Sequence, residues 1–261
     1  MNREYIKKIY GSRHFWWHLT LADLRAKYQR TALGMLWSII QPLAMTLLLA
    51  FVLTSIFKQP VQNTILYIYS GIICWNLIVF ASISGSMSFM NAAPYMKQFA
   101  HPIAIYPLRS VLVGLIDFGL ALIGLICWVL IQQPGNVSLS WLSTPIAILL
   151  LLLTAWPLAI ICAVSGTIFR DFSQLLTILL QALYFISPVF FSTQVFIDGG
   201  IGFLVYYNPI YYLLELIRAP ILYGEFPTLI NYGVIILLMI SLWCIAVVLL
   251  SYFEKRIILY L

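Results

Sequence analysis

Charged residues are scarce in this 261-residue chain. Asp, Glu, Lys and Arg make up 8% of it, whereas soluble domains carry about 25%. Apolar residues make up 63%, more than a globular core of this length can cover with a polar surface. The composition excludes a cytosolic enzyme, a disordered chain and a nucleic-acid-binding module, and it indicates an all-α integral membrane protein.

Residues and motifs that carry chemistry are also few. The four cysteines lie inside apolar runs without C-x-x-C spacing, and they are expected to be small packing residues. The three histidines lack metal-ligand spacing, so no metal site is predicted. No G-x-x-x-x-G-K-[ST] phosphate loop occurs, and no nucleophile lies beside a histidine in a recognisable arrangement. The chain is therefore expected to be neither an enzyme nor an ATP-binding protein of that kind.

Long apolar runs dominate the sequence instead. A helix needs about 20 apolar residues to cross the hydrocarbon core of a bilayer. Six such runs predict six transmembrane helices, at about residues 33–57, 61–84, 110–131, 144–169, 172–191 and 229–253. An even number of spans places both termini on the same side of the membrane.

The positions of Lys and Arg predict which side that is. The segments next to the termini, with the connections on the same side, hold all of the 14 basic residues except Lys58 and Arg218. Positive residues are concentrated in cytoplasmic segments. The sequence therefore predicts cytoplasmic N- and C-termini.

The N-terminal arm, residues 1–32, is predicted to contain an amphipathic helix that lies in the membrane surface. Apolar residues spaced by three and four form one stripe, and basic residues flank it. The residues assigned to this interface helix are Trp17, Leu21, Leu24, Arg25, Lys27, Tyr28 and Arg30. A basic tail that only sets the topology is the alternative.

Residues 85–109, on the predicted cytoplasmic side, are too many for a simple turn and too apolar for a solvated loop. Pro94, Pro102 and Pro107 are expected to limit any helix in this segment to one or two turns. We expect a partner protein to cover it.

Residues 188–227, on the predicted outer side, are apolar but interrupted by glycine and proline. Backbone that leaves helical pairing at membrane depth must be buried in protein or line a water-filled cavity. Two re-entrant half-helices that enter and leave from the periplasmic face, with a turn at Asn208-Pro209, would satisfy this requirement. A compact cap with no role in transport is the alternative.

Two further features bear on function. Asp117 is the only carboxylate inside a predicted span, which makes it a candidate functional acid unless it is protonated or paired with a hydroxyl or a base. Aromatic residues make up 15% of the chain, and most are expected to form interfacial belts. Others could form a surface on which sugar rings slide. The candidates for that surface are Trp37, Tyr67, Tyr69, Trp75, Tyr184 and Phe185.

Three segments together carry a family resemblance. One leads from a basic arm to a Gly, a Trp and a Pro, in DLRAKYQRTALGMLWSIIQPL (Asp23–Leu43). Another is an Arg-Asp turn before a run that ends in Ser-Pro, in FRDFSQLLTILLQALYFISPVFF (Phe169–Phe191). The third has Asn-Pro followed by Glu and Arg, in YYNPIYYLLELIRAPILYGEFP (Tyr206–Pro227). The three segments occur in this order along a chain with six predicted spans. With them, the chain resembles the membrane permease subunits of type-2 ABC exporters of bacterial cell-surface polysaccharide (O-antigen, capsule or teichoic acid).

The resemblance implies an assembly and a substrate. The permease would form a homodimer in the bacterial inner membrane, docked on two copies of a separate ATP-binding subunit. That subunit would hold ATP and Mg, so this chain would bind no cofactor. The substrate would be a polysaccharide linked to polyprenyl diphosphate, with O-antigen favoured over teichoic acid and capsule.

The resemblance also implies roles for particular residues. The coupling helix to the ATPase would comprise Asn91, Ala92, Ala93, Pro94, Tyr95, Met96, Lys97, Gln98 and Phe99. Arg170 and Asp171 would form the turn between the fourth and fifth spans. The periplasmic gate would include Pro188, Asn208, Pro209, Glu215 and Arg218.

Two other hypotheses remain open. A proton-coupled secondary transporter or lipid flippase would use Asp117 as its coupling acid, but no inverted repeat between span triplets is evident. A membrane-embedded transferase acting on a lipid-linked sugar would need convergent acids or histidines, and the outer acids form no such motif.

Overall fold

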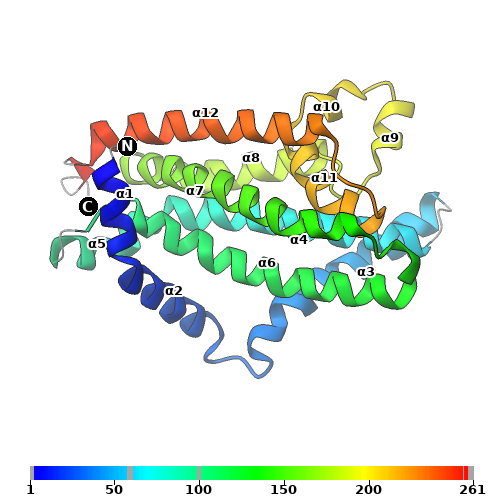
Figure 1. Cartoon of the computed structure of the whole chain (residues 1–261), viewed down its shortest axis with the longest axis horizontal. Coiled ribbons are helices and arrows are strands. Elements are labelled where there is room, and N and C mark those ends of the chain that lie inside the picture. Colours follow the sequence, from blue (N-terminus) through cyan, green and yellow to red (C-terminus); the bar gives the residue numbers. More distant parts are fainter. Residues whose placement is uncertain (1–2, 58–60, 99–100, 255, 258–261) are drawn as a thin grey trace.

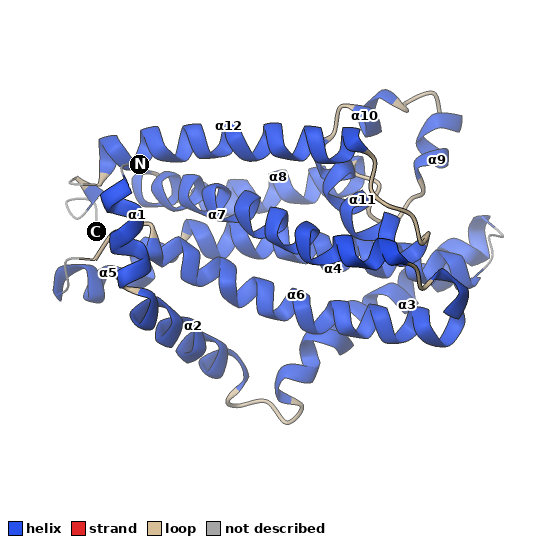
Figure 2. Cartoon of the chain, in the orientation of Figure 1, coloured by secondary structure: helices blue, strands red, loops and turns tan. Residues whose placement is uncertain are grey.

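The described part of the chain is a bundle of helices without strands. A computed structural model describes residues 3–57, 61–98, 101–254 and 256–257 (Figures 1 and 2). Five helices in these ranges are long and apolar enough to cross a membrane. They are α3 (Trp37–Phe57, preceded by the short helix η1, Gly34–Leu36), α4 (Val61–Ser86), α6 (Ile105–Gln132), α7 (Thr144–Ile168) and α12 (Leu229–Phe253). Their positions match five of the six predicted spans.

The helix α4 lies at the centre of the bundle and contacts α3, α6, α7, α8 and α11. Most of its described side chains are buried, and Ile68, Ile73 and Cys74 belong to the largest hydrophobic core. In contrast, α3 and α12 bury few of their large apolar side chains, and Leu48 and Leu237 are among the exposed ones. These two helices therefore present apolar surface to lipid or to another protein.

The predicted fifth span is helical over only part of its length. The helix α8 (Phe172–Ile186) has 15 residues, which is about 22 Å at 1.5 Å per residue and shorter than the ~30 Å hydrocarbon core. A proline disfavours helical backbone at the preceding residue, and Ser187 before Pro188 is accordingly extended, with ψ 147°. The predicted fifth span is therefore helical only as far as Ile186.

The predicted cytoplasmic connection at 85–109 is more helical than expected. The helix α5 (Ser88–Gln98) has 11 residues and contains Pro94, so the expected limit of one or two turns is wrong. The next span, α6, begins five residues before residue 110 and contains Pro107. This proline is accommodated because it lies in the first turn, where backbone N–H groups have no partner within the helix.

Short helices gather at the two ends of the bundle (Figure 1). One end, called the α5 end, carries α5, α1 (Arg3–Gly11), the start of α2 (Arg13–Tyr28) and the last turns of α12. The opposite end, called the α11 end, carries α9 (Thr193–Asp198), α10 (Phe203–Tyr206) and α11 (Pro209–Leu222). The short helices η2 (Pro134–Asn136) and η3 (Leu139–Ser143) join α6 to α7. The first and last described helices thus meet at the α5 end.

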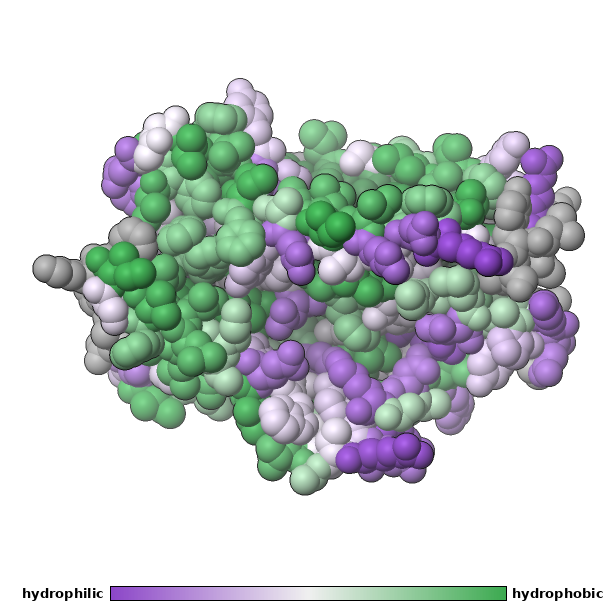
Figure 3. Space-filling model, turned by 180° about the vertical axis from the view of Figure 1, so that it is seen from behind, coloured by the Kyte–Doolittle hydropathy of each residue, from purple (hydrophilic) through white to green (hydrophobic). Residues whose placement is uncertain are grey.

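The polarity of the surface follows this division. In Figure 3, which shows the molecule from behind, hydrophobic side chains cover most of the half towards the α11 end. Hydrophilic side chains gather towards the α5 end and reach inward to about the middle of this face. Polar side chains therefore extend from the α5 end along one side of an otherwise apolar bundle.

Candidate functional site

The helix α5 presents one buried and one exposed face. Phe89, Ala92 and Met96 are buried against the ends of the long helices. The exposed residues of the predicted coupling helix are Asn91, Pro94, Tyr95, Lys97 and Gln98, whereas Ala93 is half-buried and Phe99 lies outside the described residues. Met87 and Met90 extend the exposed face with apolar surface. The arrangement suits docking of a second protein on a helix that is anchored from behind.

A hydrophobic cluster joins α5 to the N-terminal arm. Its buried members include Ile9 of α1, Phe89 and Met96 of α5, and Leu250 of α12. The elbow between α1 and α2 is tied to the same region, because the Phe15 ring stacks on the His101 ring with 4.3 Å between centroids. A displacement of α5 would therefore act on α1 and α2 as well as on the long helices.

The helix α2 packs along α6 with a face that differs from the predicted apolar stripe. Leu24 is buried as expected, and Leu21 and Tyr28 are half-buried, but Trp17 is 45% exposed. Thr20, which lies outside the stripe, is buried. Arg25 and Arg30 are exposed. The face towards the protein is thus partly polar, and apolar spacing alone did not reveal it.

Two ion pairs of opposite polarity join α2 to α6. Arg109 Nε lies 2.7 Å from Asp23 Oδ2, and Lys27 Nζ lies 2.5 Å from Asp117 Oδ2. Burial raises the pKa of Asp23 above its ordinary value, and Arg109 opposes this shift without cancelling it. Burial alone would lower the pKa of Lys27, but the hydrogen bond and the charge of Asp117 together raise it. Lys27 therefore remains protonated beside Asp117.

Asp117 receives further hydrogen bonds, so it is not an isolated acid. The Tyr28 hydroxyl donates to its Oδ1 at 2.7 Å, and the Ser38 hydroxyl donates to the same atom at 2.9 Å. With Lys27, these partners bring α2, α3 and α6 together. Asp117 is thus paired with a base and with hydroxyls, which is one of the alternatives that the sequence left open.

The predicted outer gate residues lie at the α11 end, where three helices replace the two expected half-helices. Asn208 and Pro209 begin α11 rather than forming a turn between two halves. The Asn208 side chain caps the helix by accepting from the Ile210 N–H at 3.0 Å, and its amide donates to Ser187 Oγ at 2.8 Å. The start of α11 is thereby tied to the end of α8.

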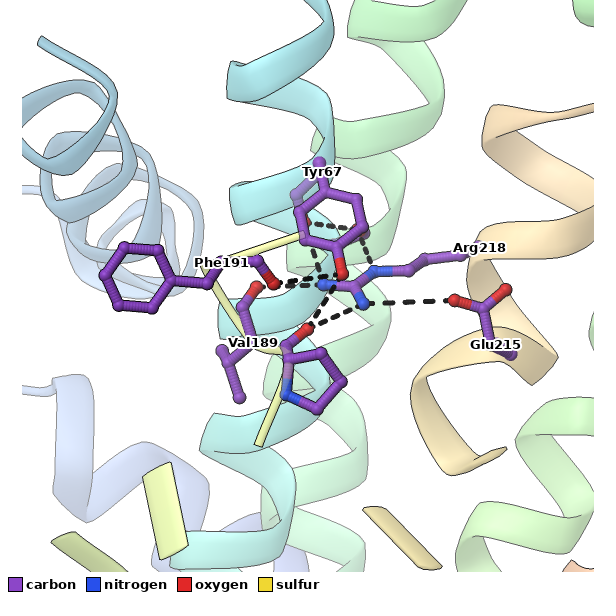
Figure 4. Close-up of polar contacts among 7 residues, drawn as sticks. Tyr67, Val189, Phe191, Glu215 and Arg218 are labelled. Atoms are coloured by element: carbon purple, nitrogen blue, oxygen red, sulfur yellow. Dashed lines mark hydrogen bonds and ion pairs between the residues drawn. The ribbon is translucent and has the colours of Figure 1, made fainter. Parts of the chain in front are cut away.

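Arg218 is the centre of this region and is completely buried, with 0% exposure (Figure 4). Its Nη1 donates to the Pro188 carbonyl at 2.8 Å, and its Nη2 donates to the carbonyls of Val189 at 2.8 Å and Tyr67 at 3.1 Å. Its Nε donates to Ser70 Oγ at 3.2 Å. The guanidinium therefore satisfies backbone carbonyls where α8 has ended and the chain is no longer helical.

Tyr67 and Glu215 lie on different sides of the same guanidinium (Figure 4). The Arg218 Cζ is 3.6 Å from the centroid of the Tyr67 ring, a close cation–π contact. The Tyr67 hydroxyl donates to the carbonyls of Pro188 at 3.1 Å and Phe191 at 3.2 Å. Glu215 Oε1 is 4.0 Å from Arg218 Nη1 and is the nearest counter-charge. The sequence predicted Arg218 in the periplasmic gate segment, and the structure buries it in α11.

Gly71 permits this close approach of α4 to the chain after α8. A Cβ at this position would overlap the Val189 carbonyl oxygen and lie 2.7 Å from Arg218 Nη2. Sequence analysis missed Ser70, Gly71 and Val189 as members of the site. A glycine inside an apolar run was a usable signal, because it marks positions where another segment comes close.

Most of the aromatic candidates are engaged inside the protein. Tyr69 is 2% exposed and its hydroxyl donates to the Ala121 carbonyl, while Trp75 is buried against the half-buried Tyr184. Neither Tyr69 nor Trp75 is open to a sugar in this structure, because each packs into the core around α4. Trp37 and Phe185 expose their rings.

The remaining predicted residues lie at a single turn. Arg170 and Asp171 are exposed in the connection between α7 and α8, where the sequence placed them. Among the residues that the structure describes, no group of three His, Cys, Asp or Glu side chains could hold a metal ion.

The fold and these sites define an all-helical, multi-pass membrane protein. More specifically, the chain belongs to the ABC-2 type transporter family, whose pattern matches residues 14–222. It is 24% identical to the O-antigen export system permease protein RfbA of Klebsiella pneumoniae over 91% of this chain and 90% of that protein.

Two further relatives also match most of their length. The RfbA protein of Myxococcus xanthus is 22% identical, over 82% of each chain. The polysialic acid transport protein KpsM of Escherichia coli is 26% identical, over 79% of this chain and 80% of that protein. The family resemblance drawn from sequence motifs is confirmed.

Proposed function

We propose that this protein is the membrane permease subunit of an ATP-driven exporter that moves lipid-linked polysaccharide out of the cytoplasm. The observation that carries the proposal is the similarity to permeases and transport proteins for O-antigen and polysialic acid along about four-fifths or more of each chain. O-antigen is the favoured substrate, with teichoic acid and capsule as related possibilities. The permease would carry out no chemistry itself.

In the proposed topology the chain crosses the bacterial inner membrane six times. The fifth crossing would consist of α8 and the extended residues that follow it, whose carbonyls bond to Arg218 and Tyr67. The α5 end would face the cytoplasm, because the basic residues are concentrated in the segments assigned to that side. The helices α9 to α11 would then form a re-entrant periplasmic segment.

The helix α5 would couple the permease to a separate ATP-binding subunit. Its exposed Met90, Pro94 and Tyr95 offer an apolar docking face, and its buried Phe89 and Met96 connect it to α1 and α12. Closure of the ATP-binding subunits would be transmitted through this cluster. ATP and Mg would be held by those subunits, and a second copy of the permease would complete the complex.

The alternative of a proton-coupled transporter or flippase rests on Asp117. A coupling acid must exchange its proton during the cycle, but this carboxylate is held by Lys27 and two hydroxyls. The geometry does not favour that alternative.

The test is to purify the permease with its proposed ATP-binding subunit and to measure polymer transport into proteoliposomes. Transport should require ATP and the partner, and transport by the permease alone would overturn the proposal. Met90→Asp and Tyr95→Asp should reduce co-purification of the partner at least tenfold. Tyr10→Asp is the matched control, because Tyr10 is an exposed aromatic residue of α1 outside the proposed docking face.

A further inference from the structure

A cavity of about 360 Å³ opens between α2, α3, α4 and α6. This volume lies within the range of about 300–1,000 Å³ that is typical of small-molecule pockets. Its polar lining comprises Lys27, Tyr28, Ser38, Gln41, Asn76 and Asp117, with Ser84 near the end of α4. The indole of Trp37 and apolar side chains such as Phe80 complete the wall.

Two amides in this lining have no structural role that would explain them. Asn76 is exposed although it lies in the middle of α4, the most enclosed of the long helices, and Gln41 is exposed in the first half of α3. Neither side chain hydrogen-bonds to any group in the described ranges of the chain. An amide that faces hydrocarbon without a partner costs several kcal/mol. The cavity therefore suits polar contents rather than an acyl chain.

The charge of the cavity selects among polar ligands. Its one cation, Lys27, already lies 2.5 Å from its one anion, Asp117, so the lining is neutral as a whole. A phosphate would have to compete with Asp117 for Lys27 and would meet the carboxylate at close range. An uncharged ligand rich in hydroxyl groups meets no such penalty.

The remaining groups match a sugar ring. The amides of Gln41 and Asn76 can both donate to and accept from the hydroxyls of a sugar. The Tyr28 and Ser38 hydroxyls already donate to Asp117, so they can accept from the sugar. The Trp37 indole is 42% exposed and offers a flat apolar face to the C–H side of a ring. A sugar ring could therefore stack its C–H face on Trp37 while its hydroxyls bond to the polar groups of the lining.

We propose that this cavity is a binding site for an uncharged sugar unit of the transported polymer, with Asn76 and Gln41 as its hydrogen-bonding residues and Trp37 as its stacking surface. The proposal rests on the proposed function. It assigns to the cavity the glycan part of the substrate and not the diphosphate. The ion pair between Lys27 and Asp117 would keep α2 against α6 and so maintain the shape of the cavity.

The first experiment measures protection of the cavity in the complete complex with the ATP-binding subunit. The exposed Cys127 and Cys244 are replaced by Ala, and Asn76→Cys is labelled with a maleimide. One probe is polymer released from its lipid by mild acid, and the other is inorganic diphosphate. We expect the polymer to slow labelling at least fivefold and diphosphate to leave it unchanged. Thr31→Cys is the matched control, because Thr31 is exposed in the turn next to the cavity but does not line it.

Each contrary result of this experiment overturns the inference. Protection by diphosphate instead of polymer would show an anion site. Labelling that neither probe slows would show that the cavity does not bind the glycan. If Asn76→Cys cannot be labelled in the complex without polymer, another protein surface fills the cavity.

A second experiment separates a binding role from a structural one. Asn76→Leu removes the amide at similar size, and Asn76→Gln keeps an amide. We expect Asn76→Leu to lower polymer transport at least fivefold while complex assembly and unfolding temperature stay unchanged, and Asn76→Gln to restore part of the transport. Equal transport by wild type and Asn76→Leu would overturn the inference and leave the proposed function intact. Absence of transport by the wild-type complex would instead contradict the proposed function.

Discussion

The protein contains two charged centres within its helical bundle, and their charges are stabilised in different ways. Arg218, at the α11 end, is fully buried and bonds mainly to backbone carbonyls, with Glu215 only at 4.0 Å. Lys27, in the last turn of α2, is 40% exposed at its side chain and pairs directly with Asp117. The first centre compensates for missing helical hydrogen bonds. The second neutralises an acid beside a cavity.

The difference teaches what each centre can tolerate. Removing a buried cation that donates to several carbonyls takes away several buried hydrogen bonds at once, and a carbonyl left without any donor costs about 1–3 kcal/mol. An accessible ion pair loses little when one member changes, because solvent replaces the partner. We therefore expect large structural effects at the α11 end and small ones at Asp117.

The largest effect is expected for Arg218→Leu. The Val189 carbonyl would lose its donor, whereas the carbonyls of Pro188 and Tyr67 would each lose one donor and keep a hydroxyl. Together these losses should cost about 3 kcal/mol of unfolding free energy. Thermal unfolding of the purified protein in detergent measures the change. The unfolding temperature of Arg218→Lys should lie between those of the wild type and Arg218→Leu, because an ammonium keeps the charge but not the planar guanidinium. An unchanged unfolding temperature for Arg218→Leu would show that these bonds do not hold the segment.

Gly71→Ala tests the close packing at the same centre. The new methyl group would overlap the Val189 carbonyl, and we expect a loss of about 2 kcal/mol, within the range for overpacking. Gly119→Ala is the control, because no atom lies within 4 Å of a Cβ built there. In a helix this change should be neutral or stabilising by up to about 1 kcal/mol. Equal destabilisation by the two substitutions would contradict the assigned contact.

Tyr67→Phe removes only a hydroxyl from the cluster. The carbonyls of Pro188 and Phe191 would each lose one donor, so we expect a loss of about 1 kcal/mol while the ring contact with Arg218 remains. The unfolding temperature of Tyr67→Phe should be compared with that of Tyr232→Phe, a tyrosine of α12 outside the cluster. If the two variants unfold at the same temperature, the Tyr67 hydroxyl does not stabilise this segment.

The smallest effect is expected for Asp117→Asn. Loss of the charge weakens the pair with Lys27, and for a partly exposed pair this is worth up to about 1 kcal/mol. Polymer export should persist, measured as cell-surface polysaccharide at matched expression. Abolished export by a correctly folded Asp117→Asn protein would instead support the proton-coupled alternative.

The sequence by itself determined the membrane class, the family and the positions of five long helices. These features depend on apolar length and on local motifs, which can be read one segment at a time. The Ser-Pro that ends α8 and the Asn-Pro that begins α11 carried a local signal, because proline restricts its own backbone and that of its neighbour. The predicted fifth span nevertheless continued past the first pair, and a turn between two half-helices was predicted at the second. The sequence did not reveal that α5 continues through Pro94, because that helix is supported by the packing of Phe89, Ala92 and Met96.

Only the tertiary structure decided which polar residues belong together. Arg218 bonds to groups about 30 and 150 residues away in the chain, and Asp117 pairs with a lysine 90 residues before it. Charge and spacing describe one segment and contain no information about which distant carbonyl or acid it will face. A buried polar group is costly without a partner, and which partner it meets depends on how the helices pack against one another.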